Sequence, residues 1–492
     1  MNRASNKKRK VGIIGAGLGG LSAAVRLAHA GCEVTVFEKN GGVGGKMNHH
    51  EQGGFTWDTG PSLLTMPQVL RELFEEVGEK MEDHLTLIPL ETTCRYRWRD
   101  GTTIDENADF WKRPDVSKFL KYARGIYEIS ADAFLRNDLS DWWRLLKVEN
   151  LRKLLHFPKM ADPRSMHHVV SRAFRDPHVR QIFDRFATYN GSSPYRTPAA
   201  FNIIPFVQAE FGGWYVQGGM FRIAEALEKL ACARGVKFRF GESVTGMTRR
   251  PGGYGLAIDG NWEAFDGVVC NKDSVLSYQN LVPREVASWF KNRFLHKRDI
   301  STSGFILCLG VKKQYPGLAH HNIFFSDDYK TEFTELFGAR QPAQQPTIYV
   351  CSSSRTEAGR APEGCDNWFV LVNAPALRST MRWSQFGEEY AERVIDQLQF
   401  EFGFEGLRQQ IVERTMYTPA DFRKVYSSYA GSIYGFASHG LFKAFLRPPM
   451  SHPLLPKFHF AGGTTHPGGG IPLVLLSGGI AARKLLAEFA HD

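Results

Sequence analysis

The pattern of hydrophobic and polar positions at the start of the chain predicts a strand, a helix and a second strand. The run "KVGIIGAG" (10–17) is short and β-branched, and "CEVTVFEK" (32–39) carries a similar apolar run. Between them, "GGLSAAVRLAHAG" (19–31) repeats small and apolar residues at helical spacing and ends at a glycine. Strands that are apolar throughout are typical of a parallel sheet covered on both faces. The start of the chain is therefore predicted to form a right-handed strand–helix–strand unit.

The pattern then changes character along the chain. Basic and aromatic side chains accompany helical spacing in "DFWKRPDVSKFLKYARGIYEI" (109–129) and "DWWRLLKVENLRKLLHFPKM" (141–160). A helix, the strand "VKFRF" and the buried strand of "FDGVVCNKD" follow, and apolar runs predict more strands within about 300–440. A final strand, "KFHFAGG", precedes a helix from about residue 471. Signals like those at the start of the chain thus return in separated segments.

Composition bounds the class of protein. The chain has 492 residues, so we expect two domains or one large domain with an insertion. The net charge of +10 favours acidic partners such as anionic lipid or a phosphate-bearing cofactor, or else aids solubility. Nucleic acid is not predicted as a partner, because no binding module accompanies the charge. The seven cysteines are scattered without CxxC spacing, which argues against disulfides and against a metal site.

The N-terminal segment indicates where in the cell the protein is expected to be. "MNRASNKKRK" resembles the basic start of a signal peptide, but the next segment is too rich in glycine and soon reaches Arg26 and His29. No run of about 18 apolar residues is present to span a bilayer. We expect no signal peptide, no transmembrane helix, and a cytoplasmic protein that meets membranes only at their surface.

A glycine motif lies between the first strand and the first helix. Gly15, Gly17 and Gly20 form GxGxxG, with Gly19 beside them, and Glu38 ends the second strand. The glycines allow a tight turn and close approach of the backbone to a pyrophosphate, which the helix N-terminus attracts. The acid is placed to accept hydrogen bonds from ribose hydroxyls. This combination predicts dinucleotide binding rather than a structural turn.

A second glycine loop favours FAD over NAD. Glu38 already favours an unphosphorylated ribose over NADP. The loop "GGVGGKMNHH" (41–50) follows at once and contains Gly44, Gly45 and Lys46. Its amides and its cation are suited to the pyrophosphate of a longer, folded-over cofactor. The alternative is a surface turn with a solvated lysine.

Longer motifs resemble a known family. "GFTWDTGPSLLTMP", "ATYNGSSPYRTPAAFNIIPFV", "GGWYVQGGMFRIAEALEKLA", "HHNIFF" and "FAGGTTHPGGGIPLVLLSGGIAARKLL" join the two glycine loops across residues 11 to about 487. Together they resemble the bacterial-type phytoene desaturase family, and most closely its diapophytoene (dehydrosqualene) desaturases.

The resemblance implies a fold and a set of cofactor residues. The expected class is α/β, with a Rossmann-like FAD-binding domain and an inserted mixed α+β substrate domain, as in the flavin amine oxidase and GDI architecture. The FAD domain would comprise residues 1–80, 213–295 and 440–492, with a helical, membrane-associating region at 81–212 and a mixed substrate domain at 296–439. Glycines near the C-terminus can lie flat against the flavin ring, beside the positive end of the last helix. The residues expected near FAD are Asp58, Gly60, Pro61, Val244, Gly463, Thr465, His466, Gly468, Gly470 and Ile471.

The resemblance also implies an activity. An FAD-dependent desaturase would move a hydride from a long polyene, such as diapophytoene or phytoene, to flavin N5 and a proton to a base. His466 is a candidate base, or else it orients the backbone. Asp184 and Arg185 are candidates for the wall of the substrate tunnel, or else they form a solvated ion pair. The basic aromatic helices suggest entry of the substrate from the membrane surface, or else a solvated face. Oxygen or a quinone would accept the electrons.

Other activities stay open at this point. Relatives of the same family act as carotenoid oxygenases or cis-trans isomerases with the same flavin motifs. A flavin amine oxidase shares the glycine start, although "THPGGGIP" speaks against it. A prenyl-binding protein without flavin shares the fold, but would not need Glu38 together with both glycine loops.

Overall fold

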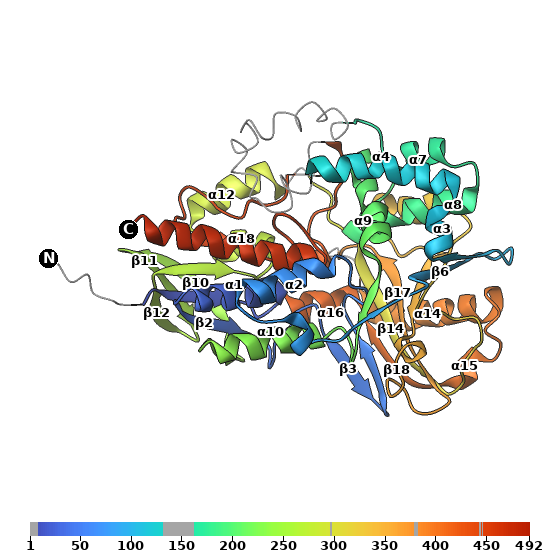
Figure 1. The fold of residues 1–492 in the computed structure, drawn as a ribbon, viewed down its shortest axis with the longest axis horizontal. Helices are drawn as coiled ribbons and strands as arrows, with labels where there is room; N and C mark the ends of the chain where they lie inside the picture. The colour runs from blue at the N-terminus through green and yellow to red at the C-terminus, as the bar shows by residue number, and fades with distance from the viewer. Residues whose placement is uncertain (1–7, 131–161, 296–297, 378–381, 442–443, 445) are drawn as a thin grey trace.

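The computed structural model describes residues 8–130, 162–295, 298–377, 382–441, 444 and 446–492. A five-stranded parallel sheet organises one half of the molecule (Figure 1). Its strand order is β19–β13–β1–β2–β9. The bounds of these strands are Lys10–Ile14 (β1), Glu33–Glu38 (β2), Lys237–Phe240 (β9), Gly267–Cys270 (β13) and Phe458–Phe460 (β19).

Helices cover one face of this sheet, and a small antiparallel sheet together with α11 and α12 covers the other. Helix α1 packs against α10 and α18, and all three share a core with Val11 and Ile13 of β1. On the other face, a Cβ on Gly12 would lie 3.0 Å from Leu256, which shows how closely the small sheet approaches. Because both faces are covered, the central strands β1 and β13 are almost entirely buried, whereas the edge strand β9 carries Lys237 and Arg239. The elements are α1 (Leu18–His29), α2 (Pro67–Glu76), α10 (Arg222–Ala233), α18 (Ile471–Ala490), β10 (Val244–Arg250), β11 (Gly253–Ile258), β12 (Asn261–Phe265), α11 (Ser274–Asn280) and α12 (Arg284–Arg293).

A seven-stranded mixed sheet organises the other half, in the order β18–β14–β17–β16–β15–β6–β7. Side chains alternate along its strands: Trp368 and Val370 of β17 pack against α14, while Phe369 and Leu371 face the opposite side. That opposite side forms cavity walls. The elements are β6 (Cys94–Arg97), β7 (Thr103–Glu106), β14 (Ser303–Val311), β15 (His321–Phe324), β16 (Ile348–Cys351), β17 (Asp366–Ala374), α14 (Trp383–Asp396) and β18 (Ile411–Tyr417).

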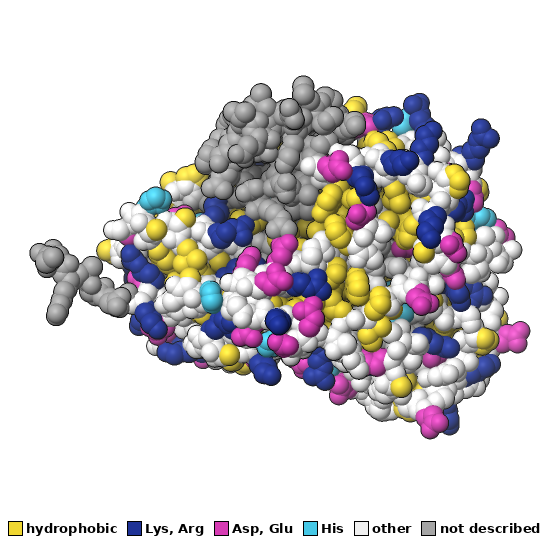
Figure 2. All heavy atoms as spheres, viewed as in Figure 1, with side chains coloured by type: hydrophobic (Ala, Val, Ile, Leu, Met, Phe, Trp, Pro, Cys, Tyr) yellow, Lys and Arg dark blue, Asp and Glu magenta, His cyan; other side chains and the backbone are white. Residues whose placement is uncertain are grey.

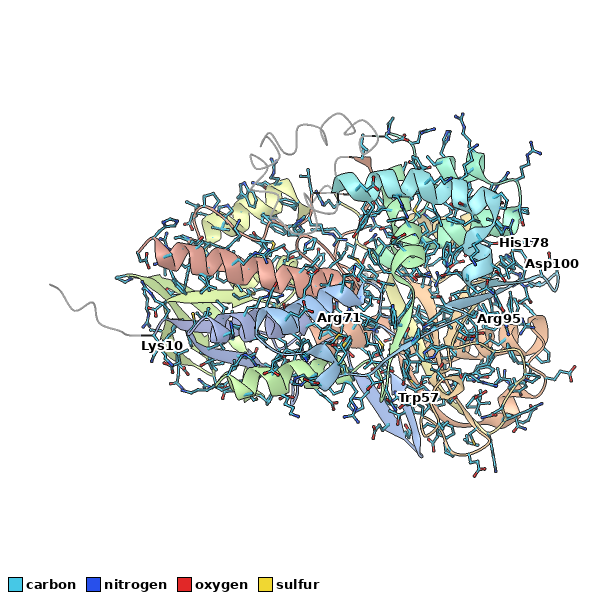
Figure 3. The ribbon with its side chains drawn as sticks, viewed as in Figure 1. Lys10, Trp57, Arg71, Arg95, Asp100 and His178 are labelled. Atoms are coloured by element: carbon cyan, nitrogen blue, oxygen red, sulfur yellow. The ribbon has the colours of Figure 1, made fainter. Side chains whose placement is uncertain are left out.

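A helical layer closes the end of this sheet. It consists of α3 (Ala108–Lys112), α4 (Pro114–Ser130), α7 (Met166–Ala173), α8 (Pro177–Arg185) and α9 (Ile203–Phe211). Lysine and arginine side chains gather over α4, α7 and α8 on the face shown in Figure 2. Figure 3 places Asp100, at the turn between β6 and β7, beside His178 of α8. The His178 Nε2 and Asp100 Oδ2 atoms are 3.1 Å apart, so an ion pair links the layer to the sheet when His178 is protonated.

The start of the 81–212 segment differs from the helical prediction. After one short 3₁₀ turn, η1 (Met81–Asp83), it continues with β5 (Leu87–Pro89), β6 and β7, and α-helices start only at α3. In β6, Cys94 and Tyr96 are buried, and this alternation suits a sheet better than a helix. The turn of the hairpin contains Gly101, whose φ of +86° favours glycine. Strand β6 pairs in parallel with β15, which is far away in sequence. The position of this short hairpin in the sheet therefore depends on a tertiary contact that the local sequence does not show.

Most other predicted elements are confirmed. The first strand–helix–strand unit, the strand "VKFRF", the strand before Asn271 and the helix from Ile471 all appear. The second basic helix, 141–160, lies outside the described residues. The bounds of the domains stay a prediction. Within the described part of the chain, no helix combines the length and the apolar character that crossing a membrane requires.

Candidate functional site

A cavity of about 340 Å³ lies at the carboxyl ends of the parallel strands. The loop after β1 contributes Gly15 and Gly17, the end of β2 contributes Glu38, and the start of β10 contributes Val244. Loops at this edge of an open α/β sheet are the usual position of a ligand site. We call this space the first cavity.

The glycines of GxGxxG allow α1 to approach the strands closely. Gly15 has a φ of +96°, and a Cβ on Gly20 would lie 2.1 Å from the carbonyl oxygen of Gly15. A Cβ on Gly17 or Gly19 would lie within 2.7 Å of the side-chain amide of Asn271. Gly15 and Gly17 line the first cavity, whereas Gly19 and Gly20 pack behind it. The turn thus leaves room for a phosphate group at the N-terminus of α1.

Glu38 is buried at the end of β2, with 7% of its surface exposed. Its two carboxylate oxygens accept hydrogen bonds from the amides of Ala16 and Asn40, both at 2.9 Å. These bonds hold the carboxylate in the wall of the first cavity. Its free lone pairs suit the hydroxyls of a ribose.

The second glycine loop packs directly on the first. The amide of Gly44 donates to the carbonyl of Ala16 at 2.9 Å, and a Cβ on Gly45 would lie 3.3 Å from Gly17. Lys46 lines the first cavity and donates to the carbonyl of Ile433 at 2.6 Å. Burial lowers the pKa of Lys46, and the nearby Asp273 opposes this effect. The loop therefore does not carry a freely solvated lysine.

The C-terminal glycine turn divides its residues between two environments. Gly463, Gly470 and Ile471 line the first cavity, and Gly470 has a φ of +106° with open space around its Cβ position. The free backbone amides at the N-terminus of α18 create a positive electrostatic potential at this wall. Thr465 instead donates to the carbonyl of Pro448 at 2.7 Å, and Gly468 packs against Arg447.

Asp58 forms a buried ion pair and does not line the first cavity. It lies 3.3 Å from the guanidinium of Arg360, and both side chains are more than nine-tenths buried. The amide of Phe221 also donates to it, at 3.4 Å. Burial raises the pKa of Asp58, and Arg360 opposes this effect. The nearby Gly60 and Pro61 line the first cavity, whereas Asp58 does not.

A second cavity of about 430 Å³ adjoins the first. The two share a wall formed by Gly60, Pro61, Phe369, Leu371, Ile433, Tyr434, Gly469, Gly470 and Ile471. Much of the second cavity is apolar, with Leu63, Ile203, Ile204, Val207 and Leu473 in its lining. Its volume falls in the range of small-molecule sites.

Three polar residues singled out in the sequence lie near this second cavity. His466, with 5% of its surface exposed, is part of its wall. Asp184 and Arg185 do not form a solvated ion pair: Asp184 lies 2.6 Å from Nδ1 of His167, and Arg185 lines the second cavity. Burial raises the pKa of Asp184, and the bond from His167 opposes this effect.

Several wall residues were missed in the sequence. Asn271, Lys272 and Asp273 follow β13 and line the first cavity. Their position at the carboxyl end of a parallel strand was a usable signal. Tyr434 and Phe369 had no such signal, because they come from the other half of the molecule.

Comparison with known proteins agrees with this architecture. Residues 18–486 match the model of the family described as flavin containing amine oxidoreductase. A 4,4'-diapolycopene oxygenase of Methylomonas sp. is 36% identical, over 98% of this chain and 99% of its own. A 1-hydroxycarotenoid 3,4-desaturase of Flavobacterium sp. (strain P99-3) is 34% identical, over 96% of this chain and 98% of its own. The structure of putrescine oxidase has a TM-score of 0.63 at 15% identity, over 98% of this chain and 99% of its own, and shows the same fold.

These findings confirm the predicted fold class and the resemblance to flavin-dependent carotenoid enzymes. The alternative of a prenyl-binding protein without flavin or activity is wrong. The first cavity also fits the cofactor, because its glycines leave space beside a helix N-terminus and Glu38 faces it. The chain belongs to the flavin-containing amine oxidoreductase family and is an FAD-dependent oxidoreductase.

Proposed function

We propose that the protein desaturates a long, apolar polyene of the carotenoid class, such as diapophytoene or phytoene. The observation that carries this proposal is the wall shared by the first and second cavities, which brings an apolar space against the expected flavin position. The full-length relatives named as a carotenoid desaturase and a carotenoid oxygenase support the substrate class.

Bound FAD would supply a hydride acceptor at the shared wall. Gly15, Gly17 and Glu38 would hold the adenosine and pyrophosphate end, with Val244 beside the adenine. Gly463, Gly470 and Ile471 would face the ring. Leu371 and Tyr434, which belong to the shared wall, would pack against the polyene. They would hold its reacting carbons in place and exclude water from them.

His466 is the proposed acceptor of the proton. We expect His466→Asn to lower the rate of flavin reduction by about 10²-fold, because the proton would lose a positioned base. Stopped-flow reduction of the loaded enzyme measures this step. The control is His29→Asn, at the exposed end of α1, which leaves the rate unchanged. If His466→Asn keeps the rate of the parent enzyme, His466 only orients the turn.

Terminal oxygenation is a second candidate, because the relative of Methylomonas sp. is named as an oxygenase. The two reactions differ in whether oxygen enters the product. The test is an anaerobic mixture of FAD-loaded protein and liposomes that contain diapophytoene or phytoene. Desaturation predicts loss of the oxidised flavin band together with new visible polyene bands. Unchanged flavin, followed by an oxygen-containing product from a coloured carotenoid in air, would instead establish oxygenation.

The reoxidant of the flavin would be oxygen or a quinone. After anaerobic reduction, the return of the flavin band on adding either one identifies the acceptor.

Helix α4 is proposed to contact the membrane surface. Its Phe119 is buried and Ile126 lines the second cavity, whereas Lys118 and Lys121 are exposed. The contact would therefore depend on charge rather than on inserted aromatic rings, and it would place the membrane next to the cavity.

We expect Lys118→Glu with Lys121→Glu to weaken binding to anionic vesicles by roughly 30-fold or more, since each lysine contributes about 1 kcal/mol near such a surface. Vesicle co-sedimentation measures the effect. Lys229→Glu with Lys312→Glu changes the net charge equally at other exposed lysines and is expected to have a smaller effect. Equal losses for both pairs would contradict a specific role of α4.

A further inference from the structure

One end of the second cavity carries polar groups that lack partners. Arg185, His321 and Tyr329 line this cavity and are at least nine-tenths buried. Within the described residues, Nη1 of Arg185, Nε2 of His321 and the hydroxyl of Tyr329 each have no hydrogen-bond partner. A polar atom that is buried without a partner is costly, so an arrangement of three beside one cavity is informative.

Arg185 is held by aromatic rings instead of a carboxylate. Its guanidinium lies 5.6 Å from the ring centroid of Tyr96, 5.8 Å from that of Phe186 and 5.4 Å from that of Tyr189. The nearby carboxylate of Glu106 instead accepts hydrogen bonds from Tyr96 and Gln208. These contacts orient the cation at the cavity wall, and within the described residues its Nη1 has no hydrogen-bond partner.

His321 is a neutral neighbour with one free nitrogen. Its Nδ1 is 2.8 Å from the hydroxyl of Tyr349, which also lies 2.5 Å from Oγ of Ser62. Burial, together with the charges of His320 and Arg185, holds the pKa of His321 well below its usual range. Its Nε2 is thus available as a donor or acceptor, beside the cation.

We propose that this polar end binds an acceptor oxygen, carbonyl or carboxylate, at one end of the polyene substrate. A pure hydrocarbon in the cavity would keep water away from Arg185 and give it nothing in exchange, which is unfavourable. An oxygen at the chain end would accept from Arg185 and from Tyr329 while the apolar chain runs toward the shared wall. The inference rests on the proposed function and narrows it: diapophytoene and phytoene are hydrocarbons, so they would bind less tightly than polyenes of the same class that carry an oxygen at one end.

The test compares ligands that share one polyene and differ only at its end. FAD-loaded protein is titrated with retinal, retinoic acid, retinol and axerophtene, the corresponding hydrocarbon, and binding is followed by quenching of protein fluorescence. We expect retinal and retinoic acid to bind roughly tenfold to a hundredfold more tightly than axerophtene, as for a hydrogen bond to a charged group. Tighter binding of retinoic acid than of retinal would identify a carboxylate as the preferred end.

Variants separate recognition from structural support. Arg185→Met is expected to remove the preference while axerophtene binds at least as tightly as before, because no unpaired cation is then buried, and Tyr329→Phe is expected to reduce the preference. The control Arg172→Met changes an exposed arginine of α7 and should keep the preference. Retained FAD shows that each variant is folded, and Tyr329→Phe alone tests the site if Arg185→Met loses the cofactor.

Two results would overturn the inference, and they are distinguishable. Equal affinity of the parent protein for all four ligands would refute the polar site and leave the proposed function standing. Failure to bind any of them would refute the polar site, and the anaerobic flavin assay with diapophytoene or phytoene then decides separately whether the proposed function stands. Equal weakening of all ligands by Arg185→Met would show that Arg185 only supports the cavity wall.

Discussion

Gly20→Ala is expected to abolish FAD binding and to lower the free energy of unfolding by about 3 kcal/mol or more, the upper end for overpacking. The added Cβ would lie 2.1 Å from the carbonyl oxygen of Gly15, and a backbone atom cannot move aside as a flexible side chain can. Helix α1 would have to shift away from β1, and its N-terminus would leave the position that a pyrophosphate needs. The FAD content of purified protein and its melting temperature measure the two effects.

Gly41→Ala is the matched control for this change. Gly41 belongs to the second glycine loop, is exposed, and has open space around its Cβ position. We expect its FAD content and melting temperature to equal those of the parent protein. A Gly20→Ala variant that keeps full FAD content would show that α1 does not need this close approach.

Asp58→Ala is expected to destabilise the protein by about 3–5 kcal/mol, because it leaves the buried guanidinium of Arg360 without its carboxylate. The pair joins the hairpin of β3 (His49–Gln52) and β4 (Phe55–Asp58) to a segment that follows β16. Arg360 also donates to the carbonyl of Gly218 at 2.9 Å, so the pair holds three segments together. Resistance to urea, followed by fluorescence, measures the loss.

The double variant Asp58→Ala with Arg360→Met serves as the control. Removing both charges leaves no unpaired ion, so part of the stability is expected to return. A double variant as unstable as the sum of the two single variants would contradict coupling. FAD bound to the folded fraction of Asp58→Ala would distinguish this structural role from the cofactor contact predicted from the sequence.

Much of the cofactor site could be predicted because its requirements are local. The strand–helix–strand unit follows from periodicity, and the special backbone angles of Gly15 and Gly470 follow from the residues themselves. Glu38 could be placed by its position at the end of β2. Thr465, Gly468 and Asp58 could not be placed in the same way, because being near a cofactor loop does not determine where a side chain points.

The short hairpin β6–β7 shows a second limit of prediction from sequence. Its strands contain four residues each, too few for periodicity to separate a strand from a helical turn. The place of the hairpin in the sheet depends on the pairing of β6 with β15, more than 200 residues away. The sequence between β6 and β7 did contain a turn signal in Asp100 and Gly101.

By itself, the sequence determined the class of the protein and predicted three parts of its cofactor site: a nucleotide-binding unit, an FAD-type second loop and a glycine turn at the C-terminus. These features are encoded in neighbouring residues, whose spacing and backbone freedom are visible along the chain. Only the tertiary structure decided that Asp58 meets Arg360, that Lys46 reaches Ile433, and that Arg185 faces the same cavity as His321. Such contacts form because folding buries apolar surface and brings distant segments together, and each buried charge then takes whichever partner the packing supplies.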